Sequence, residues 1–368
     1  MKYSGKNYQI REIWMKKIFI LSLMVVLQIK LYPDIQTVVI NAVGDTMTGT
    51  YYPYKITPPQ DGAVSFDFIH YYLTNNNPDI LMANLEGVIT TLKEPVKKYV
   101  PGRSYAFNMP TNTAKYLKNA GFNLITYANN HAMDFGERGL RDTERYLNEE
   151  KILFTGRKGD FLVIEKKGIK IGVIAFSWHR WANNFNETEK AIELIKKLKA
   201  LSDILVISIH GGSEGEKAMY VPDDNEYLFG EYRGNLYRFC RVAIDNGADL
   251  IIGHGPHVIR GIEIYKGKVI AYSLGNFLTP AMSTSGNKKF SFILKVELDR
   301  NGNFISGSVV PVVLFSDGIY RGLPKYDENK TSIKMLQKLS KENFKNNSLV
   351  IDDEGKLTIL KEYKISNN

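Results

Sequence analysis

The stretch DLIIGHGPHVIRGIEIYKGKVIAYSLGNF, residues 249–277, places two histidines in a turn that directly follows a short apolar run. Residues 250–252 have the composition of a buried strand, and glycine and proline stiffen the turn G-H-G-P-H after it. The chain contains only six histidines, so the pair His254 and His257 stands out. Two imidazoles at one strand end indicate that both bind the same species, for which a metal ion is the first candidate.

Four further apolar runs also end in polar side chains. The runs are TVVINAVGD, DILMANLEG, FNLITYANNH and DILVISIH, and they end at or beside Asp45, Glu86, Asn130 with His131, and His210. In open α/β sheets, ligands bind at the carboxyl ends of the strands, so these side chains are expected to converge on one edge. A mixture of carboxylates, an amide oxygen and imidazoles suits Zn, Mn or Fe better than Ca or Mg.

Each of these motifs has a structural alternative when it is taken alone. Gly44-Asp45 is a common turn, Glu86 could cap the next segment, and the asparagines before His131 could bond their own backbone. His210 could be a core histidine with satisfied hydrogen bonds. Coincidence would have to recur at five successive strand ends, which favours a shared site. The two other histidines, His70 on a helix face and His179 in SWHRW, lie outside such positions.

Helical patterns separate the apolar runs, and hairpin patterns with Lys-Gly and Asn-Gly turns interrupt them. This alternation predicts an α/β domain whose sheets are part parallel and part antiparallel. The chain has 368 residues, of which 44% are hydrophobic, and that is enough for a substantial core. We expect one domain over residues 37–324. Residues 325–368 are rich in Lys and Asn and are expected to form a partly ordered tail.

The charge distribution argues against nucleic-acid binding. The formal net charge is +9, but residues 1–31 hold six basic and one acidic residue, against 42 basic and 38 acidic in the remainder. The net charge is therefore +5 over residues 1–31 and +4 over the remainder. The sequence contains no dense basic stripe of the kind that binds nucleic acid. The single cysteine, Cys240, allows no intrachain disulfide.

Residues 1–34 are expected to be an N-terminal extension with a signal peptide or a membrane anchor. MKKIFILSLMVVLQI, residues 15–29, has a basic start and an apolar run of signal-peptide length. No small-x-small cleavage site follows, so a cleaved signal and an uncleaved anchor both stay open, as does a buried N-terminal helix. Either Met1 or Met15 is the true start. Export to the cell envelope, the periplasm or the exterior is the expectation.

Six motifs occur here in the order found in another group of proteins. They are GD, NLE, ANNHAMDFGERGL, a strand ending in H-x-G-x-E, GHGPHV and YSLGNF. The chain resembles capsule-biosynthesis proteins of the CapA type, in the calcineurin-like metallophosphoesterase superfamily. The resemblance covers roughly residues 38–324. It implies a four-layer αββα sandwich of the metallo-dependent phosphatase type, with two mixed central sheets and a metal site on one edge.

The resemblance also implies a role for each candidate residue. Asp45 matches the first carboxylate ligand, Glu86 the bridging carboxylate, Asn130 the amide ligand, His210 and His254 ligands of one metal, His257 a ligand of the other, and His131 the residue that assists ester cleavage. The superfamily's Asp-x-His motif is here Asp45-Thr46-Met47, so one imidazole is missing. One tightly bound Mn, Zn or Fe ion and a second, weaker one are therefore expected.

Two functions of different classes follow from this pattern. The first is a metal-dependent, phosphoesterase-like hydrolase in which His131 protonates a leaving group. Glu214 would act as a base or a positioning residue there, or be a solvated loop carboxylate, and Arg103 and Arg260 would meet an anionic substrate. The second is a non-catalytic, metal-containing component that binds an anionic polymer beside a membrane-bound polymer synthase. The resemblance implies capsule or poly-γ-glutamate synthesis or export for both.

Overall fold

The computed structural model describes residues 36–360. The expected signal peptide or anchor at residues 1–34 and the last eight residues lie outside the described residues. Within residues 36–360, no helix combines the length and the apolar character that a membrane span requires.

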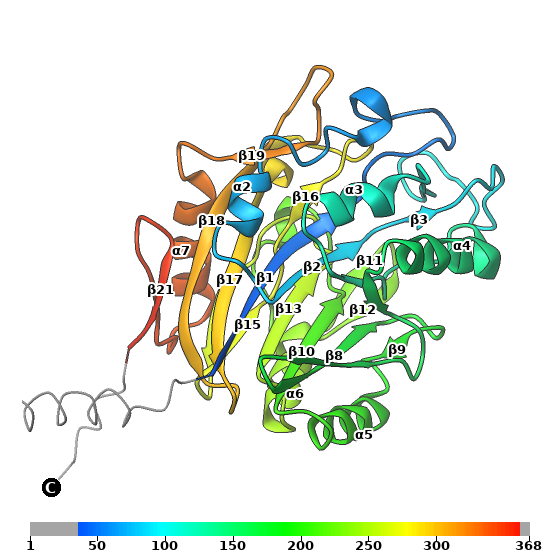
Figure 1. Ribbon diagram of the computed structural model, residues 1–368. Coiled ribbons are helices and arrows are strands. Elements are labelled where there is room, and N and C mark those ends of the chain that lie inside the picture. Colours follow the sequence, from blue (N-terminus) through cyan, green and yellow to red (C-terminus); the bar gives the residue numbers. More distant parts are fainter. Residues whose placement is uncertain (1–35, 361–368) are drawn as a thin grey trace, which may run out of the picture. The chain divides into compact units, whose positions relative to one another are not determined.

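Two mixed sheets form the centre of the domain (Figure 1). The first sheet has the order β20-β21-β18-β17-β1-β2-β5-β6, with β16 beside β1 and β19 beside β18. Strands β1, β2, β5 and β6 run parallel to one another, and β17 to β21 add antiparallel pairs. The bounds are β1 Thr37–Thr46, β2 Ile80–Leu85, β5 Leu124–Thr126, β6 Leu153–Thr155, β16 Asn276–Leu278, β17 Phe290–Asp299, β18 Phe304–Leu314, β19 Pro324–Tyr326, β20 Leu349–Ile351 and β21 Lys356–Ile359.

The second sheet has the order β14-β15-β13-β10-β8-β7, with β9 beside β8. Strands β8, β10, β13 and β15 are parallel, whereas β7 and β14 close the two edges through antiparallel hairpins. The prediction of sheets that are part parallel and part antiparallel is confirmed. The bounds are β7 Leu162–Lys166, β8 Ile169–Ser177, β9 Asn183–Asn184, β10 Ile204–His210, β13 Leu250–His254, β14 Ile262–Tyr265 and β15 Lys268–Ala271.

The sheets pack face to face, and helices cover their outer faces. Alternate residues of β1 show the arrangement: Val38, Ile40 and Ala42 point into the core shared with the second sheet, while Asn41 faces α2. Helices α2 (His70–Thr74), α3 (Thr113–Asn119) and α4 (Gly136–Glu149) cover the first sheet, and α5 (Thr188–Lys199) and α6 (Leu236–Asp245) cover the second. The four-layer αββα prediction is confirmed.

The domain continues past the boundary expected at residue 324. Helix α7 (Thr331–Asn343) packs against β17, β18 and β14, and β20 and β21 extend the first sheet. Ile333, Leu336 and Leu339 form the buried face of α7. The lysine-rich composition of this segment suggested a tail, although its apolar residues recur at helical spacing.

Short elements complete the described part of the chain. They are β3 Val88–Ile89 paired with β4 Asn108–Met109, β11 Glu226–Leu228 paired with β12 Glu231–Gly234, and the 3-10 turns η1 Pro59–Gly62, η2 Glu216–Ala218 and η3 Gly286–Lys289.

Candidate metal centre

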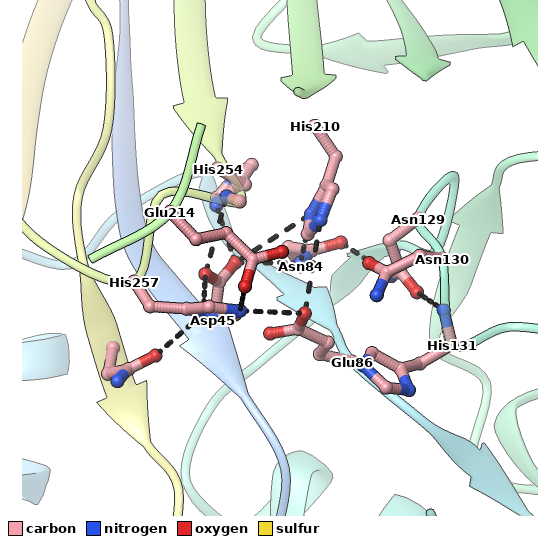
Figure 2. A network of polar contacts seen from close by, with 12 residues as sticks. Asp45, Asn84, Glu86, Asn129, Asn130, His131, His210, Glu214, His254 and His257 are labelled. Carbon is pink, nitrogen blue, oxygen red and sulfur yellow. Dashed lines mark hydrogen bonds and ion pairs between the residues drawn. The ribbon is translucent and has the colours of Figure 1, made fainter. Parts of the chain in front are cut away.

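The carboxyl ends of the parallel strands meet at one edge of both sheets. In register, Asp45 of β1 pairs with Asn84 of β2, and His210 of β10 pairs with His254 of β13. Figure 2 shows these side chains converging, with Glu86 just beyond the end of β2. The structure thus brings together Asp45 and Gly255, which lie 210 residues apart in the sequence.

Asp45 lies at the centre of the cluster. Its Oδ1 is 3.6 Å from His254 Nδ1 and 4.0 Å from His210 Nδ1, and its Oδ2 is 3.2 Å from His257 Nδ1. Glu86 Oε1 lies 3.9 Å from His210 Nε2 and 3.6 Å from His257 Nε2. Donor atoms of Asp45, Glu86 and His257 all lie within 4.8 Å of one another.

Unpartnered buried atoms test whether these residues fit a metal ion. Within the described residues, both carboxylate oxygens of Glu86, Oδ1 of Asn130, Nε2 of His210 and both ring nitrogens of His254 are buried without a hydrogen-bond partner. A buried polar atom left in this state costs about 1–3 kcal/mol, and more when it is charged. A divalent cation would satisfy atoms of this kind, and the mixture of oxygen and imidazole donors is one that Mn, Zn or Fe accepts.

Burial and mutual charge shift the pKa values of the cluster. Burial raises the pKa of Glu86 well above its usual range. Burial lowers the pKa of His210 well below its usual range and that of His254 to about 4, so both are neutral imidazoles at neutral pH. Burial also lowers the pKa of His257, but the carboxylates around it, led by Glu86, outweigh this and raise it to about 10. Only neutral imidazoles coordinate metal, so a bound cation must displace the proton of His257.

The backbone of His257 is unusual for a residue with a side chain, because its φ is +57°. Its ring is held on one side: Nδ1 lies 3.0 Å from Asn276 Oδ1 and 3.2 Å from Asp45 Oδ2. These two acceptors hold the proton on Nδ1, which leaves Nε2 facing Glu86 as a donor atom for a cation.

Two asparagines that the sequence patterns did not single out support the cluster. Asn84 Nδ2 donates to Asp45 Oδ1 at 2.8 Å and lies 3.2 Å from His210 Nδ1. Asn129 Nδ2 donates to Asn84 Oδ1 at 2.9 Å, and Asn129 Oδ1 accepts the backbone N–H of His131. Because the amide of Asn129 is engaged in this way, the unpartnered oxygen of Asn130 is the one available to a metal.

His131 lies beside the cluster and is oriented by its own partners. His131 Nδ1 is 2.7 Å from Asp134 Oδ2, and Asp134 Oδ1 pairs with Lys97 Nζ at 3.0 Å. The carboxylate holds the proton on Nδ1, which directs Nε2 away from Asp134. Burial lowers the pKa of His131, while Asp134 opposes that shift. Asp134 was not predicted, although the spacing H-x-x-D in NNHAMD could have pointed to it, whereas nothing in the sequence pointed to Lys97.

A cleft of about 810 Å³ opens over the cluster. Arg103 lies in its wall, with its guanidinium 5.7 Å from the centre of the Phe229 ring. The cleft is also lined by Lys97, Lys98, Asn130, His131, His179, Glu214, Arg233, His257 and Lys288.

Arg260 does not face this cleft, which disagrees with the expectation that it meets an anionic substrate. Its side chain is fully buried and forms a two-pronged ion pair with Glu226, with Nη1 3.0 Å from Oε1. Its Nε donates to the backbone oxygen of Ala218. A buried guanidinium needs such partners, and Glu226 lies 34 residues earlier in the chain, so the pairing left no local signal.

The missing imidazole of the Asp-x-His motif has no replacement at the same position. Met47 is fully buried in the core between the first sheet and its covering helices. The ion bound by Asp45, Glu86 and His257 would therefore have only three ligands from the residues predicted for it.

Comparisons with known proteins show a likeness to capsule-synthesis proteins. Residues 39–281 match the family described as "Bacterial capsule synthesis protein PGA_cap". The PGA biosynthesis protein CapA of Bacillus subtilis (strain 168) is 29% identical over 294 residues, which cover 75% of this chain and 71% of the relative. The capsule biosynthesis protein CapA of Bacillus anthracis is 26% identical over 315 residues, covering 77% of this chain and 72% of the relative.

Solved structures give fainter likenesses. The 5'-nucleotidase precursor from Thermus thermophilus matches with a TM-score of 0.42 and 12% identity, over 76% of this chain and 54% of that one. The purple acid phosphatase from yellow lupin seeds matches with a TM-score of 0.36 and 10% identity, over 81% of this chain and 55% of that one.

Proposed function

The chain belongs to the bacterial capsule synthesis protein family PGA_cap, and from this premise we propose that it is an envelope protein with a metal-dependent, phosphoesterase-like hydrolase site. It would work in the synthesis or export of a capsule polymer such as poly-γ-glutamate, beside a membrane-bound polymer synthase. The observation that supports the hydrolase site most is the buried cluster of unpartnered ligand atoms at the base of an open cleft.

Six side chains would hold metal: Asp45, Glu86, Asn130, His210, His254 and His257. A divalent ion bound there supplies Lewis-acid stabilisation for negative charge that develops on a phosphoryl or acyl oxygen. Glu86 Oε1 lies near both His210 and His257, so Glu86 would be the ligand that the two ions share. Asn84 donates to Asp45 and is itself held by Asn129, so the asparagine pair fixes the position of Asp45.

His131 would protonate the leaving group. It lines the cleft without belonging to the ligand cluster, and Asp134 stabilises its protonated form. Lys97 pairs with Asp134 and also donates to the backbone oxygen of Asn130. Lys97 therefore supports both the partner of His131 and a residue of the metal cluster.

The walls of the cleft favour an anionic substrate. Cationic side chains line it on several sides, and their field raises the local concentration of anions. They are Lys97, Lys98, Arg103, Arg233 and Lys288. The substrate would be a phosphoester or an anionic polymer.

A non-catalytic polymer-binding component is the second candidate, and two observations favour it. The missing imidazole at Met47 weakens one metal site, and the same cationic walls suit a polycarboxylate chain. In this function the metal would be a structural element, or a handle for carboxylates.

We expect the protein reloaded with Mn or Zn to hydrolyse bis(p-nitrophenyl) phosphate, and chelator-treated protein to lose that activity. Retention on immobilised poly-γ-glutamate is measured in parallel. Hydrolysis that depends on the added metal supports the hydrolase. Metal-dependent retention without turnover of any phosphoester or acyl ester favours the binding component instead.

We also propose export, because the basic and apolar run at residues 16–29 precedes the domain and the N-terminal segment carries most of the excess charge. Fractionation of cells that express the full chain should place it in the envelope or outside, either cleaved or anchored. A cytosolic protein with an intact N-terminus would be incompatible with this assignment.

A further inference from the structure

We infer that Glu214 is a metal ligand that completes the site of Asp45, Glu86 and His257. Its carboxylate takes the place of the imidazole that is missing at Met47. The inference rests on the proposed metal centre and adds a second, full ion site to it. It also replaces the interpretation of Glu214 as a base or a solvated loop residue.

One distance places Glu214 beside the nitrogen of His257 that would bind this ion. Glu214 Oε2 lies 3.8 Å from His257 Nε2, the same nitrogen that lies 3.6 Å from Glu86 Oε1. Donor atoms that share one ion sit about 2.0–2.2 Å from it, and so lie roughly 3–4 Å from one another. Figure 2 shows the carboxylate of Glu214 reaching from its own loop toward Asp45, Glu86 and His257.

Main-chain hydrogen bonds fasten the Glu214 loop to the turn that carries the two histidines. Gly211 N donates to His254 O at 3.0 Å, and Gly215 N donates to Pro256 O at 2.9 Å. The loop therefore cannot swing away from His257 without breaking bonds on both sides of Glu214. A ligand needs such preorganisation, whereas a solvated loop carboxylate does not.

The buried ion pair of Arg260 and Glu226 supports the same loop. Glu226 Oε2 accepts the backbone N–H of Ser213 at 3.0 Å, and Arg260 Nη2 donates to Ser213 O at 3.4 Å. Gly212, directly before Ser213, has a φ of +84°, and a side chain there would press on Arg260 and Glu226. Arg260 thus acts on the site indirectly, by holding the residue next to Glu214.

Arg233 leaves one oxygen of Glu214 free. Its Nη1 is 3.2 Å from Glu214 Oε1, while Oε2 is the oxygen turned toward His257. The guanidinium lies 4.0 Å from the centre of a Trp178 ring, and the Trp178 ring stacks on His210 with centroids 5.7 Å apart. Arg233 is thereby fixed by its own packing, and it aims the carboxylate toward the cluster.

With Glu214 included, the two ion sites differ in chemistry. One site has three carboxylates and one imidazole, from Asp45, Glu86, Glu214 and His257. The other site has Glu86, Asn130, His210 and His254. Oxygen-rich sites favour Mn over Zn more than imidazole-rich sites do. The carboxylate-rich site is therefore expected to take Mn²⁺ from a mixture, while the imidazole site accepts Zn²⁺.

The test is a titration of metal-free protein with Mn²⁺, followed by calorimetry and by electron paramagnetic resonance of the bound ions. We expect wild type to bind two ions per chain with the spectrum of a coupled Mn pair. Glu214→Gln should lose the second ion or bind it at least about 100-fold more weakly, and lose the coupled spectrum. Glu216→Gln is the matched control, because Glu216 lies on the same loop but is exposed and bonds Asn287 N outside the cluster.

A second variant tests whether Glu214 acts as a metal ligand or only as the ion-pair partner of Arg233. Glu214→His removes the ion pair with Arg233 but keeps a donor atom, so it should restore a second bound ion. Loss of the second ion in Glu214→His as well would overturn the inference, as would two ions with wild-type affinity in Glu214→Gln, or a single ion in wild type. If wild type binds no ion at all, the proposed metal centre itself fails, which is a distinct result.

Discussion

Replacing His131 by alanine should lower the rate of phosphodiester hydrolysis by about 10²–10⁴-fold, the usual contribution of a positioned general acid. Metal content should stay at the wild-type level. The reason is the geometry: His131 lines the cleft and is hydrogen-bonded to Asp134, while the ligand cluster is complete without it. The measurement is kcat and KM for bis(p-nitrophenyl) phosphate, together with elemental analysis of the same samples.

His70→Ala serves as the control, because His70 is an exposed residue at the start of α2 on the outer face of the first sheet. It should behave like wild type in both assays. A His131→Ala protein that hydrolyses every substrate as fast as wild type would remove the hydrolase in favour of the polymer-binding component.

Replacing His254 by alanine should weaken metal binding by more than about 100-fold, since even residues that only support a ligand cost 10–100-fold when they are lost. His254 is 1% exposed, and neither ring nitrogen has a hydrogen-bond partner within the described part of the chain. Without metal, the variant should unfold near the wild-type temperature, because the removal of two unpartnered buried nitrogens offsets the cavity that the ring leaves. With metal, wild type should gain thermal stability and the variant should not.

His179→Ala is the matched control for this variant. His179 is a partly buried imidazole that also has an unpartnered Nε2, but its ring lies against Trp178 instead of joining the ligand cluster. It should keep both the metal and the metal-dependent rise in unfolding temperature. Equal metal content in His254→Ala and His179→Ala would exclude His254 as a ligand.

The strand ends could be predicted from the sequence because two simple patterns coincide there. A parallel strand covered on both faces is apolar along its whole length, so a polar residue at its end is conspicuous. Asp45, His210 and His254 all follow this rule, and the structure brings all three to one edge. The hairpin of β7 and β8 was predictable from its Lys-Gly turn for the same kind of local reason.

Contacts between distant segments could not be predicted from these patterns. Asn84 sits next to Asp45 only because β1 and β2 pair in one particular register. The ion pair of Arg260 with Glu226 and the contact of Lys97 with Asp134 each join segments that are far apart in the sequence. The place of α7 against the first sheet was missed because its lysines dominate the composition, although its apolar spacing was present.

The presence of a metal centre is tested most directly by the metal content of the wild-type protein. The chain is purified without chelator, reloaded with Mn or Zn, freed of excess ion and measured by elemental analysis, with circular dichroism to establish that it is folded. The cluster of Asp45, Glu86, His254 and their neighbours predicts at least one ion per chain, and two with Glu214 as a ligand. A folded protein that retains none would contradict the metal centre, and with it the proposed hydrolase.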